Sequence, residues 1–236
     1  MSAPPSSEEP DRAKKPWPNA RPLFSARATT FYRIALAAVA LLIAGSGLSL
    51  YAYYHSGYWN RVGFAPAQPV LFSHRHHAAE LRIDCRNCHA TVETSAFAGM
   101  PSTQTCLSCH SQIFTDTPML QPVVQSAARN VPLAWNRVTR LPDHVYFDHG
   151  IHIRKGVGCT TCHGEIGTMA LTAKGEPLTM RWCLRCHRDP APHLRPPSEI
   201  YAAVSPPPGS PSQQEALVRF YHVHTQTLTD CSTCHR

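Results

Sequence analysis

The sequence predicts one N-terminal membrane helix followed by an exported domain of short helices and long loops, with a core built around bound groups. Three observations predict this fold. An uncharged apolar run lies near the N-terminus, and ten cysteines fall in five C-x-x-C pairs. Proline makes up 22 of 236 residues, about twice its usual share. A chain this rich in proline, and poor in aliphatic residues outside the apolar run, cannot build an ordinary core unaided.

Each C-x-x-C pair is followed at once by a histidine, and no cysteine is left over. The pairs are Cys85/Cys88, Cys106/Cys109, Cys159/Cys162, Cys183/Cys186 and Cys231/Cys234, and the histidines are His89, His110, His163, His187 and His235. C-x-x-C-H is the attachment signature of c-type haem. Two thiols add to the two vinyl groups of one porphyrin, and the adjacent histidine reaches the iron as proximal ligand. We therefore expect five covalently attached haem c groups and a multihaem cytochrome c.

Other roles of paired cysteines explain the pattern less well. Five disulfides would suit an exported protein, and zinc ribbons also pair C-x-x-C motifs. A thioredoxin-like site needs a single pair on an α/β scaffold. None of these requires a histidine after every second cysteine, which occurs here five times in five.

Residues 34–54 form the apolar run, and their 21 residues carry no charge, which is long enough to span a bilayer. Six Lys and Arg precede the run and none follows before Arg61, so the positive-inside rule places the N-terminus in the cytoplasm. We expect a disordered cytoplasmic tail (1–30), a transmembrane signal-anchor helix (31–55) and a periplasmic pentahaem domain (56–236) in a bacterial inner membrane. A cleaved signal peptide is disfavoured, because the run is too long and lacks an A-x-A site.

The exported part contains an internal repeat. F-x-H-x-x-H stands at 72–77 and at 147–152, and each copy precedes a haem motif by seven or eight residues. The repeat predicts two dihaem modules, about 70–120 and 145–195, with the fifth haem at 213–236. Short helices are expected near 123–129 and 213–222, and the Pro/Ser-rich segment 196–212 should be a loop. No strand-like alternation is visible.

An electron-carrying haem iron needs a sixth ligand, and the repeat supplies two histidines per module. We expect these distal ligands to be His74, His77, His149 and His152. His76 could replace His77, but its counterpart in the second copy is Ile151.

For the fifth iron the candidates are Met119, Met180, Met100, His222 and His224. Met119 is preferred because it lies in a loop nine residues after His110. Methionine ligation would raise the potential of that haem. His144 and His193 are expected to be exposed or hydrogen-bonded.

The formal charge of +7 does not predict nucleic-acid binding. From residue 61 onward there are 16 Lys and Arg against 12 Asp and Glu, and the propionates of five haems would add about ten negative charges. No C-x-x-C-K motif or other catalytic constellation occurs. The chain is therefore expected to transfer electrons and not to be an enzyme by itself.

Several segments resemble a known family. They are S-A-F-A-G-M-P at 95–101, T-C-L-S-C-H-S-Q-I at 105–113, W-N-R-V at 135–138, V-Y-F-D-H at 145–149, W-C-L-R-C-H-R at 182–188 and C-S-T-C-H-R at 231–236. With the anchor and the five-haem layout, they resemble the pentahaem cytochrome c subunit of alternative complex III, the bacterial quinol:electron-acceptor oxidoreductase. The haem modules are also similar to class III (c7-type) cytochromes.

This resemblance implies a place in a respiratory or photosynthetic electron-transport chain. The implied partners are an iron–sulfur subunit, polytopic quinol-binding subunits and a monohaem cytochrome in the same membrane complex. Electrons from quinol would pass through the haems to a periplasmic carrier or a terminal oxidase.

Two other functions fit part of the pattern. One is a free-standing, membrane-anchored multihaem quinol dehydrogenase, which places its first haem motif close behind the anchor. Here about 30 residues separate Tyr54 from Cys85, which disfavours it. The other is a multihaem reductase, which needs an iron with an open coordination site.

Overall fold

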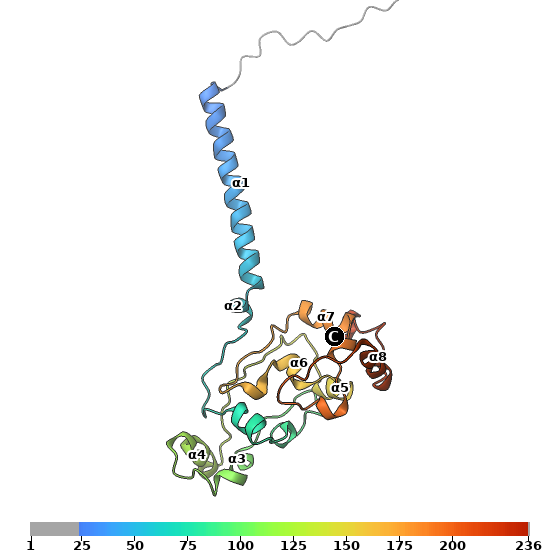
Figure 1. The fold of residues 1–236 in the computed structure, drawn as a ribbon. Helices are drawn as coiled ribbons and strands as arrows, with labels where there is room; N and C mark the ends of the chain where they lie inside the picture. Colours follow the sequence, from blue (N-terminus) through green and yellow to red (C-terminus); the bar gives the residue numbers. More distant parts are fainter. Residues whose placement is uncertain (1–23, 236) are drawn as a thin grey trace, which may run out of the picture. The chain divides into compact units, whose positions relative to one another are not determined.

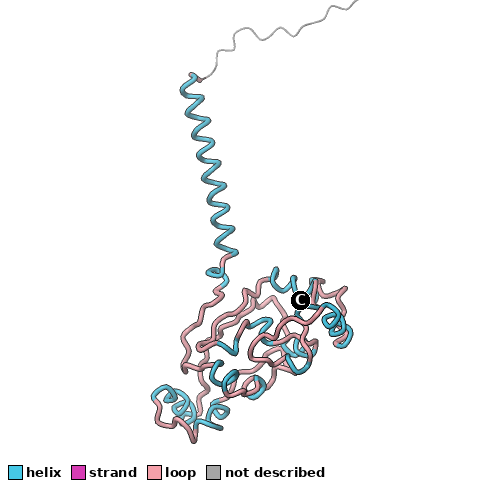
Figure 2. Tube along the Cα trace, viewed as in Figure 1, coloured by secondary structure: helices cyan, strands magenta, loops and turns pink. Residues whose placement is uncertain are grey.

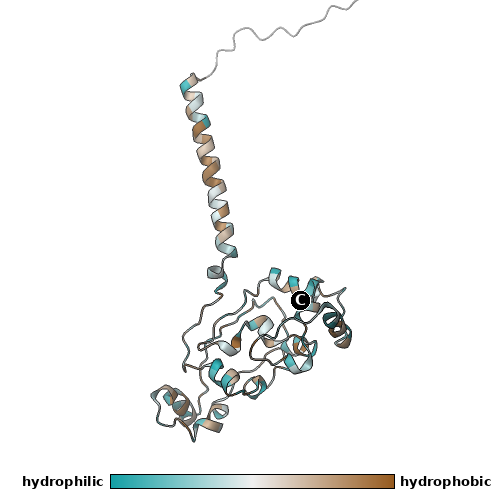
Figure 3. Ribbon diagram, in the orientation of Figure 1, coloured by the Kyte–Doolittle hydropathy of each residue, from teal (hydrophilic) through white to brown (hydrophobic). Residues whose placement is uncertain are grey.

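A computed structural model describes residues 24–235 and separates the chain into two units, 1–54 and 55–236. In the first unit, helix α1 (Ala26–His55) is 30 residues long and apolar enough to cross a membrane (Figures 1 and 3). This confirms the predicted N-terminal apolar helix, although α1 begins within the predicted tail. The rest of that tail, residues 1–23, lies outside the described residues.

The second unit consists of short helical elements joined by loops (Figure 2). The α-helices are α2 (Gly57–Asn60), α3 (Thr103–His110), α4 (Gln121–Arg129), α5 (His149–Arg154), α6 (Cys159–His163), α7 (Met180–Arg188), α8 (Pro211–Phe220) and α9 (Cys231–Cys234). A π-helix, η1 (Arg75–Glu80), and five 3-10 turns, η2 (Cys85–Asn87), η3 (Pro118–Leu120), η4 (Ile166–Thr168), η5 (Ala191–His193) and η6 (Pro197–Glu199), complete the set. Between residues 24 and 235 there is no strand, only one isolated bridge between Val157 and Leu194.

Three of the five helical elements that carry haem motifs begin at side-chain caps. Ser102 accepts a hydrogen bond from the backbone N–H of Thr105 at the start of α3, and Thr179 accepts one from Trp182 in α7. Asp84 caps the 3-10 turn of the first motif in the same way. Helices this short are marginal in water, so each depends on its cap and on packing against the rest of the domain.

The expected loop helices are present. Helix α4 covers the predicted segment 123–129 and ends at Asn130, whose φ of 53° closes the helix. Helix α8 begins two residues before the predicted 213, behind a capping box formed by Ser210 and Gln213. The predicted loop 196–212 contains only the turn η6 before α8 starts.

The aliphatic core is small, as the composition predicts. Among the described residues only seven hydrophobic side chains are buried, and none of the large ones is fully enclosed. The one cluster consists of Val92, Ile153 and Ile200, with Cys159 and Tyr201 packed against it. Its members come from the first module, the second module and the segment after η6, so this cluster joins the modules.

A tight turn at Gly156 connects α5 to the third haem motif. Its φ is +82°, and a Cβ atom at this position would overlap the ring of Tyr221. Tyr221 donates from its hydroxyl to the carbonyl of Arg195 at 2.8 Å, and its own carbonyl accepts from Lys155 Nζ at 2.9 Å. Gly156 therefore permits the end of α8 to pack directly against the turn.

We expect Gly156→Ala to destabilise the haem domain by about 2 kcal/mol or more, because it adds a methyl group to a filled site at positive φ. The measurement is thermal unfolding of the haem-loaded protein. Gly63→Ala is the matched control, since Gly63 also has a φ of +82° but no atom lies within 4 Å of the place that a Cβ would take. Equal losses for both variants would contradict the packing role of Gly156.

Candidate functional site

The five C-x-x-C-H motifs are numbered 1 to 5 along the chain, and each histidine of the first four lies opposite one histidine of the F-x-H-x-x-H repeat. The rings of His74 and His89 are 6.5 Å apart and nearly parallel, at 9°. In the second module, His149 and His163 are 6.4 Å apart at 4°. The other two pairs are His77 with His110 (6.3 Å, 61°) and His152 with His187 (6.2 Å, 37°).

These separations fit an iron held between two imidazoles. A metal–imidazole bond is about 2 Å long, so two bonds and two half-rings span about 6 Å between ring centres. A direct ring-to-ring stack would bring the centres closer than this. The porphyrin would supply the remaining four nitrogen ligands, so a pair of histidines is sufficient.

The ring nitrogens are already oriented for this role. The Nδ1 of His89 bonds the carbonyl of Gly99 at 2.8 Å, and that of His187 bonds Leu228 at 2.8 Å. Three of the four distal rings do the same, with His77 bonded to Ser73, His152 to Asp148 and His149 to Ala96 at 2.7–2.9 Å. The Nδ1 of His74 instead bonds the hydroxyl of Thr172 at 2.9 Å. A histidine ligand usually donates its second N–H to a carbonyl, and here that bond leaves Nε2 for the metal.

Burial keeps the central imidazoles neutral. It lowers the pKa of His74 to about 4, with a smaller contribution from the neighbouring His89. The pKa of His163 also falls to about 4, again through burial first and then through His149. Only the neutral ring has a free lone pair, so these histidines are in the form that binds a metal at neutral pH.

Phe72 and Phe147 place the distal histidines identically in the two modules. Phe72 stacks on His77 at 4.4 Å and 24°, and Phe147 stacks on His152 at 4.5 Å and 28°. Each phenylalanine also meets the first histidine of its motif edge-on, His74 at 4.9 Å and His149 at 4.7 Å. The recurring phenylalanine was visible in the sequence, but its orienting role appears only in the structure.

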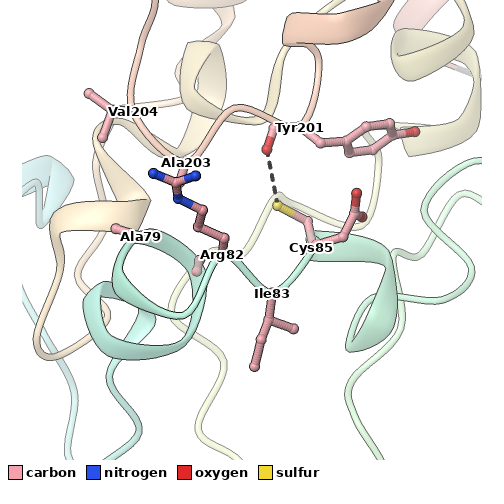
Figure 4. A pocket seen from close by; sticks show the side chains of 9 residues that line it. Ala79, Arg82, Ile83, Cys85, Tyr201, Ala203 and Val204 are labelled. Carbon is pink, nitrogen blue, oxygen red and sulfur yellow. Dashed lines mark hydrogen bonds between the residues drawn. The ribbon is translucent and has the colours of Figure 1, made fainter.

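None of the ten cysteines, which lie within the described residues, forms a disulfide. The thiol of Cys85 lines a cavity of about 330 Å³ and donates to the carbonyl of Tyr201 at 3.7 Å (Figure 4). Arg82 borders the same cavity (Figure 4), and its guanidinium suits a propionate. The first haem motif therefore has open space and a cation beside its attachment sulfur.

Thiols of different motifs lie next to one another. Cys85 and Cys159 share a hydrogen bond, and this contact with burial raises the pKa of Cys159. Burial, followed by the nearby Cys106, raises the pKa of Cys88. Burial also raises the pKa of Cys162 to about 12, with Cys186 and Cys183 as neighbours, and Cys234 adds to the same effect at Cys183.

Cys109, the second thiol of motif 2, departs from this arrangement. The motifs predict ten equivalent attachment thiols, but Cys109 is exposed, as is Cys231, whereas the other eight are partly buried. The hydroxyl of Ser108 lies 3.9 Å from its sulfur, and both residues belong to α3, at one end of the domain (Figure 1). The chain alone therefore does not enclose this sulfur. Attachment of haem at Cys109 stays a prediction, in which the porphyrin itself would cover the thiol.

Three further residues, His76, Met119 and His144, occupy different surroundings. His76 bonds Glu80 at 2.9 Å on the surface, so His77 is the histidine that faces His110. Met119 is half exposed in η3, beside α4 at one end of the domain, whereas the C-terminus lies at the other end (Figure 1). Opposite His235 stands His144, at 5.6 Å and 22°. Met119 as an iron ligand stays a prediction. His144 is exposed, as the sequence predicts, but the sequence did not indicate that its ring faces His235.

A helical domain with repeated C-x-x-C-H motifs, paired histidines and a small aliphatic core resembles that of a multihaem cytochrome c. Comparison with known proteins agrees. Residues 145–236, less than half of the chain, match the family described as cytochrome c7 and related cytochrome c. This confirms the predicted similarity to c7-type cytochromes for the second module and the C-terminus.

A curated relative is similar over more of the chain. It is the multiheme cytochrome c subunit of menaquinone reductase from Nitratidesulfovibrio vulgaris (strain Hildenborough), 27% identical over 169 residues, which cover 71% of this chain and 67% of that subunit.

We expect Phe147→Leu to loosen two iron sites without removing a haem. The variant keeps an apolar side chain but loses the ring contacts with His152 and His149, worth about 1 kcal/mol each. Electron paramagnetic resonance of the oxidised protein should show altered signals from two haems, at unchanged haem content by mass. Phe97→Leu is the control, since Phe97 is 53% exposed and its ring lies beside Arg137. Unaltered signals in Phe147→Leu would contradict the orienting role.

Proposed function

We propose that this chain is the membrane-anchored pentahaem electron-transfer subunit of a quinol-oxidising complex of the alternative complex III type. The observation that carries the proposal is the set of facing histidine pairs, each with one member in a C-x-x-C-H motif. In this proposal α1 is the anchor, and the haem domain lies in the bacterial periplasm. The complex would pass electrons to a periplasmic carrier or a terminal oxidase.

The residues of each haem site have separate roles. The ten cysteines form the thioether bonds, and the histidine of each motif is the proximal ligand. His74, His77, His149 and His152 are the distal ligands of the first four haems in motif order 1, 2, 3 and 4. Bound haem supplies reversible one-electron chemistry. On each of these four irons the chain would hold two imidazoles, which would leave no open position for a substrate.

The haems form a row whose order differs from the order of their motifs. Neighbouring thiols join motif 2 to motif 1 through Cys106 and Cys88, and motif 1 to motif 3 through Cys85 and Cys159. Motif 3 adjoins motif 4 through Cys162 and Cys186, and motif 4 adjoins motif 5 through Cys183 and Cys234. The proposed path is therefore 2–1–3–4–5, with haems 2 and 5 at its ends.

The ends of this row agree with the shape of the haem domain. Motif 2 is on α3, which packs against α4, and the C-terminal motif lies at the opposite end (Figure 1). Motifs 1 and 3 lie between them, where burial is greatest and His74 and His163 are close enough to influence each other's charge. An electron would enter at one end and leave at the other, through contacts between adjacent porphyrins.

The partners proposed are an iron–sulfur subunit, polytopic quinol-binding subunits and a monohaem cytochrome. Support comes from the exposed apolar surface of α1, which suits packing in a membrane, and from a relative that is a subunit of a menaquinone reductase. That relative's name also favours a second function, in which the same row carries electrons toward a quinone. Both functions need the same haem domain and differ in the direction of electron flow.

The direct test is purification of the natural complex in mild detergent. We expect this chain to carry five haems by intact mass, to copurify with polytopic subunits, and to be reduced when quinol is added. Fewer than five covalent haems would contradict the pentahaem assignment. Quinol oxidation by the isolated chain would favour the free-standing dehydrogenase, and haem oxidation on adding quinone would favour the quinone-reducing direction.

The haem order can be tested with distal methionine variants. His74→Met should raise the potential of haem 1, so that it becomes reduced and diamagnetic before the others. In the order 2–1–3–4–5, haem 1 is the only neighbour of haem 2. Once haem 1 is diamagnetic, the electron paramagnetic resonance signal of haem 2 should therefore no longer show magnetic coupling to another haem. His77→Met silences haem 2 and should leave haems 1, 3, 4 and 5 coupled. Isolation of haem 1 in His77→Met would instead support the order 1–2–3–4–5.

A further inference from the structure

We propose that His144 is the sixth ligand of the fifth haem iron, on the side opposite His235. The inference rests on the proposed function, since it requires a haem attached to Cys231 and Cys234. It assigns a ligand to the one iron that the F-x-H-x-x-H repeat does not serve.

The first argument is ring geometry. The centres of the His144 and His235 rings are 5.6 Å apart and their planes differ by 22°. The other four pairs lie 6.2–6.5 Å apart, so the fifth pair is 0.6 Å closer than the nearest of them. His144 is exposed, and its side chain can move by this amount without displacing packed neighbours.

The second argument is that the backbone holds the two residues together. The Nδ1 of His235 bonds the carbonyl of His144 itself at 3.0 Å, the same kind of bond that orients the proximal rings of His89 and His187. Two residues further on, the N–H of Tyr146 donates to the carbonyl of Cys234 at 2.9 Å. These bonds fix the 144–146 segment against the terminal motif and leave Nε2 of His235 for iron.

The third argument is the position of the segment in the row. His149 and His152 follow within the next eight residues and face the motif histidines of haems 3 and 4. With His144, residues 144–152 would supply the distal ligands of haems 3, 4 and 5, which are neighbours in the proposed row. Haem 5 adjoins haem 4 through Cys234 and Cys183. Residues 144–152 would therefore lie along the end of the row that contains haem 5.

The alternative ligands are placed less well. Met119 precedes α4, at the end of the domain opposite the C-terminus (Figure 1). Met180 is 66% exposed at the first position of α7, within motif 4's own helix. His222 adopts a φ of 48° at the end of α8, where its carbonyl accepts from Lys155 Nζ. His144 is the residue whose ring faces His235.

The test uses the full-length, haem-loaded protein. His144→Ala should retain five covalent haems by mass, because thioether bonds do not need a distal ligand. One of the five should become five-coordinate, seen as a high-spin ferric signal and as carbon monoxide binding after reduction. Added imidazole should restore the low-spin state. His144→Met should convert one haem to the near-infrared signature of His/Met ligation and raise its potential.

Two controls keep the result specific. His224→Ala removes another exposed histidine near the C-terminus, and Met119→Leu removes the ligand preferred from sequence; both should leave five low-spin haems. The proposal is overturned if His144→Ala leaves all five haems low-spin and unreactive to carbon monoxide, or if Met119→Leu opens an iron. Unmodified Cys231 and Cys234 in the wild-type protein would overturn the pentahaem function as well. This outcome distinguishes failure of the proposed function from failure of the His144 assignment alone.

Discussion

The facing pair of imidazoles is the constraint on which the rest of the haem domain depends. Two rings must stand about 6 Å apart on opposite sides of one porphyrin, and four pairs meet this requirement within 0.3 Å of each other. Such precision cannot come from a large aliphatic core, since only seven hydrophobic side chains are buried among the described residues. It comes from short helices and from the hydrogen bonds that orient the imidazole rings.

The supporting contacts explain why the repeat has the form F-x-H-x-x-H. Three residues of spacing place both histidines on one helical turn, and the phenylalanine before them contacts both rings. The two copies agree within 0.2 Å in these ring distances, although η1 is a π-helix and α5 is an α-helix. The phenylalanine and the Nδ1 bonds therefore determine the arrangement more strongly than the type of helix does.

Local motifs made much of this arrangement predictable. The C-x-x-C-H motifs and the F-x-H-x-x-H repeat predicted the eight histidines that form the first four pairs, and the apolar run predicted α1. Which histidine faces which is seen only in the structure. The haem order, the exposure of Cys109 and the His144–His235 contact depend instead on how distant segments meet. His144 has no repeat partner, because Pro69 occupies the corresponding position before His74. Equal offsets therefore do not reveal it. The sequence favours Met119 instead, because Met119 follows His110 by nine residues, but Met119 lies at the other end of the domain.

A long separation in sequence between a distal ligand and its haem motif adds little to the free-energy cost of bringing the two together. The entropy lost on closing a loop rises by only about 0.6 kcal/mol for each doubling of its length. His144 and His235 are 91 residues apart, so joining them costs about 1 kcal/mol more than joining residues a third as far apart. The hydrogen bonds from the Tyr146 N–H to Cys234 and from the His235 ring to His144 offset a difference of that size. For a chain whose haems replace its core, three-dimensional proximity thus selects the ligand, and a histidine three residues before the repeat can serve the last haem.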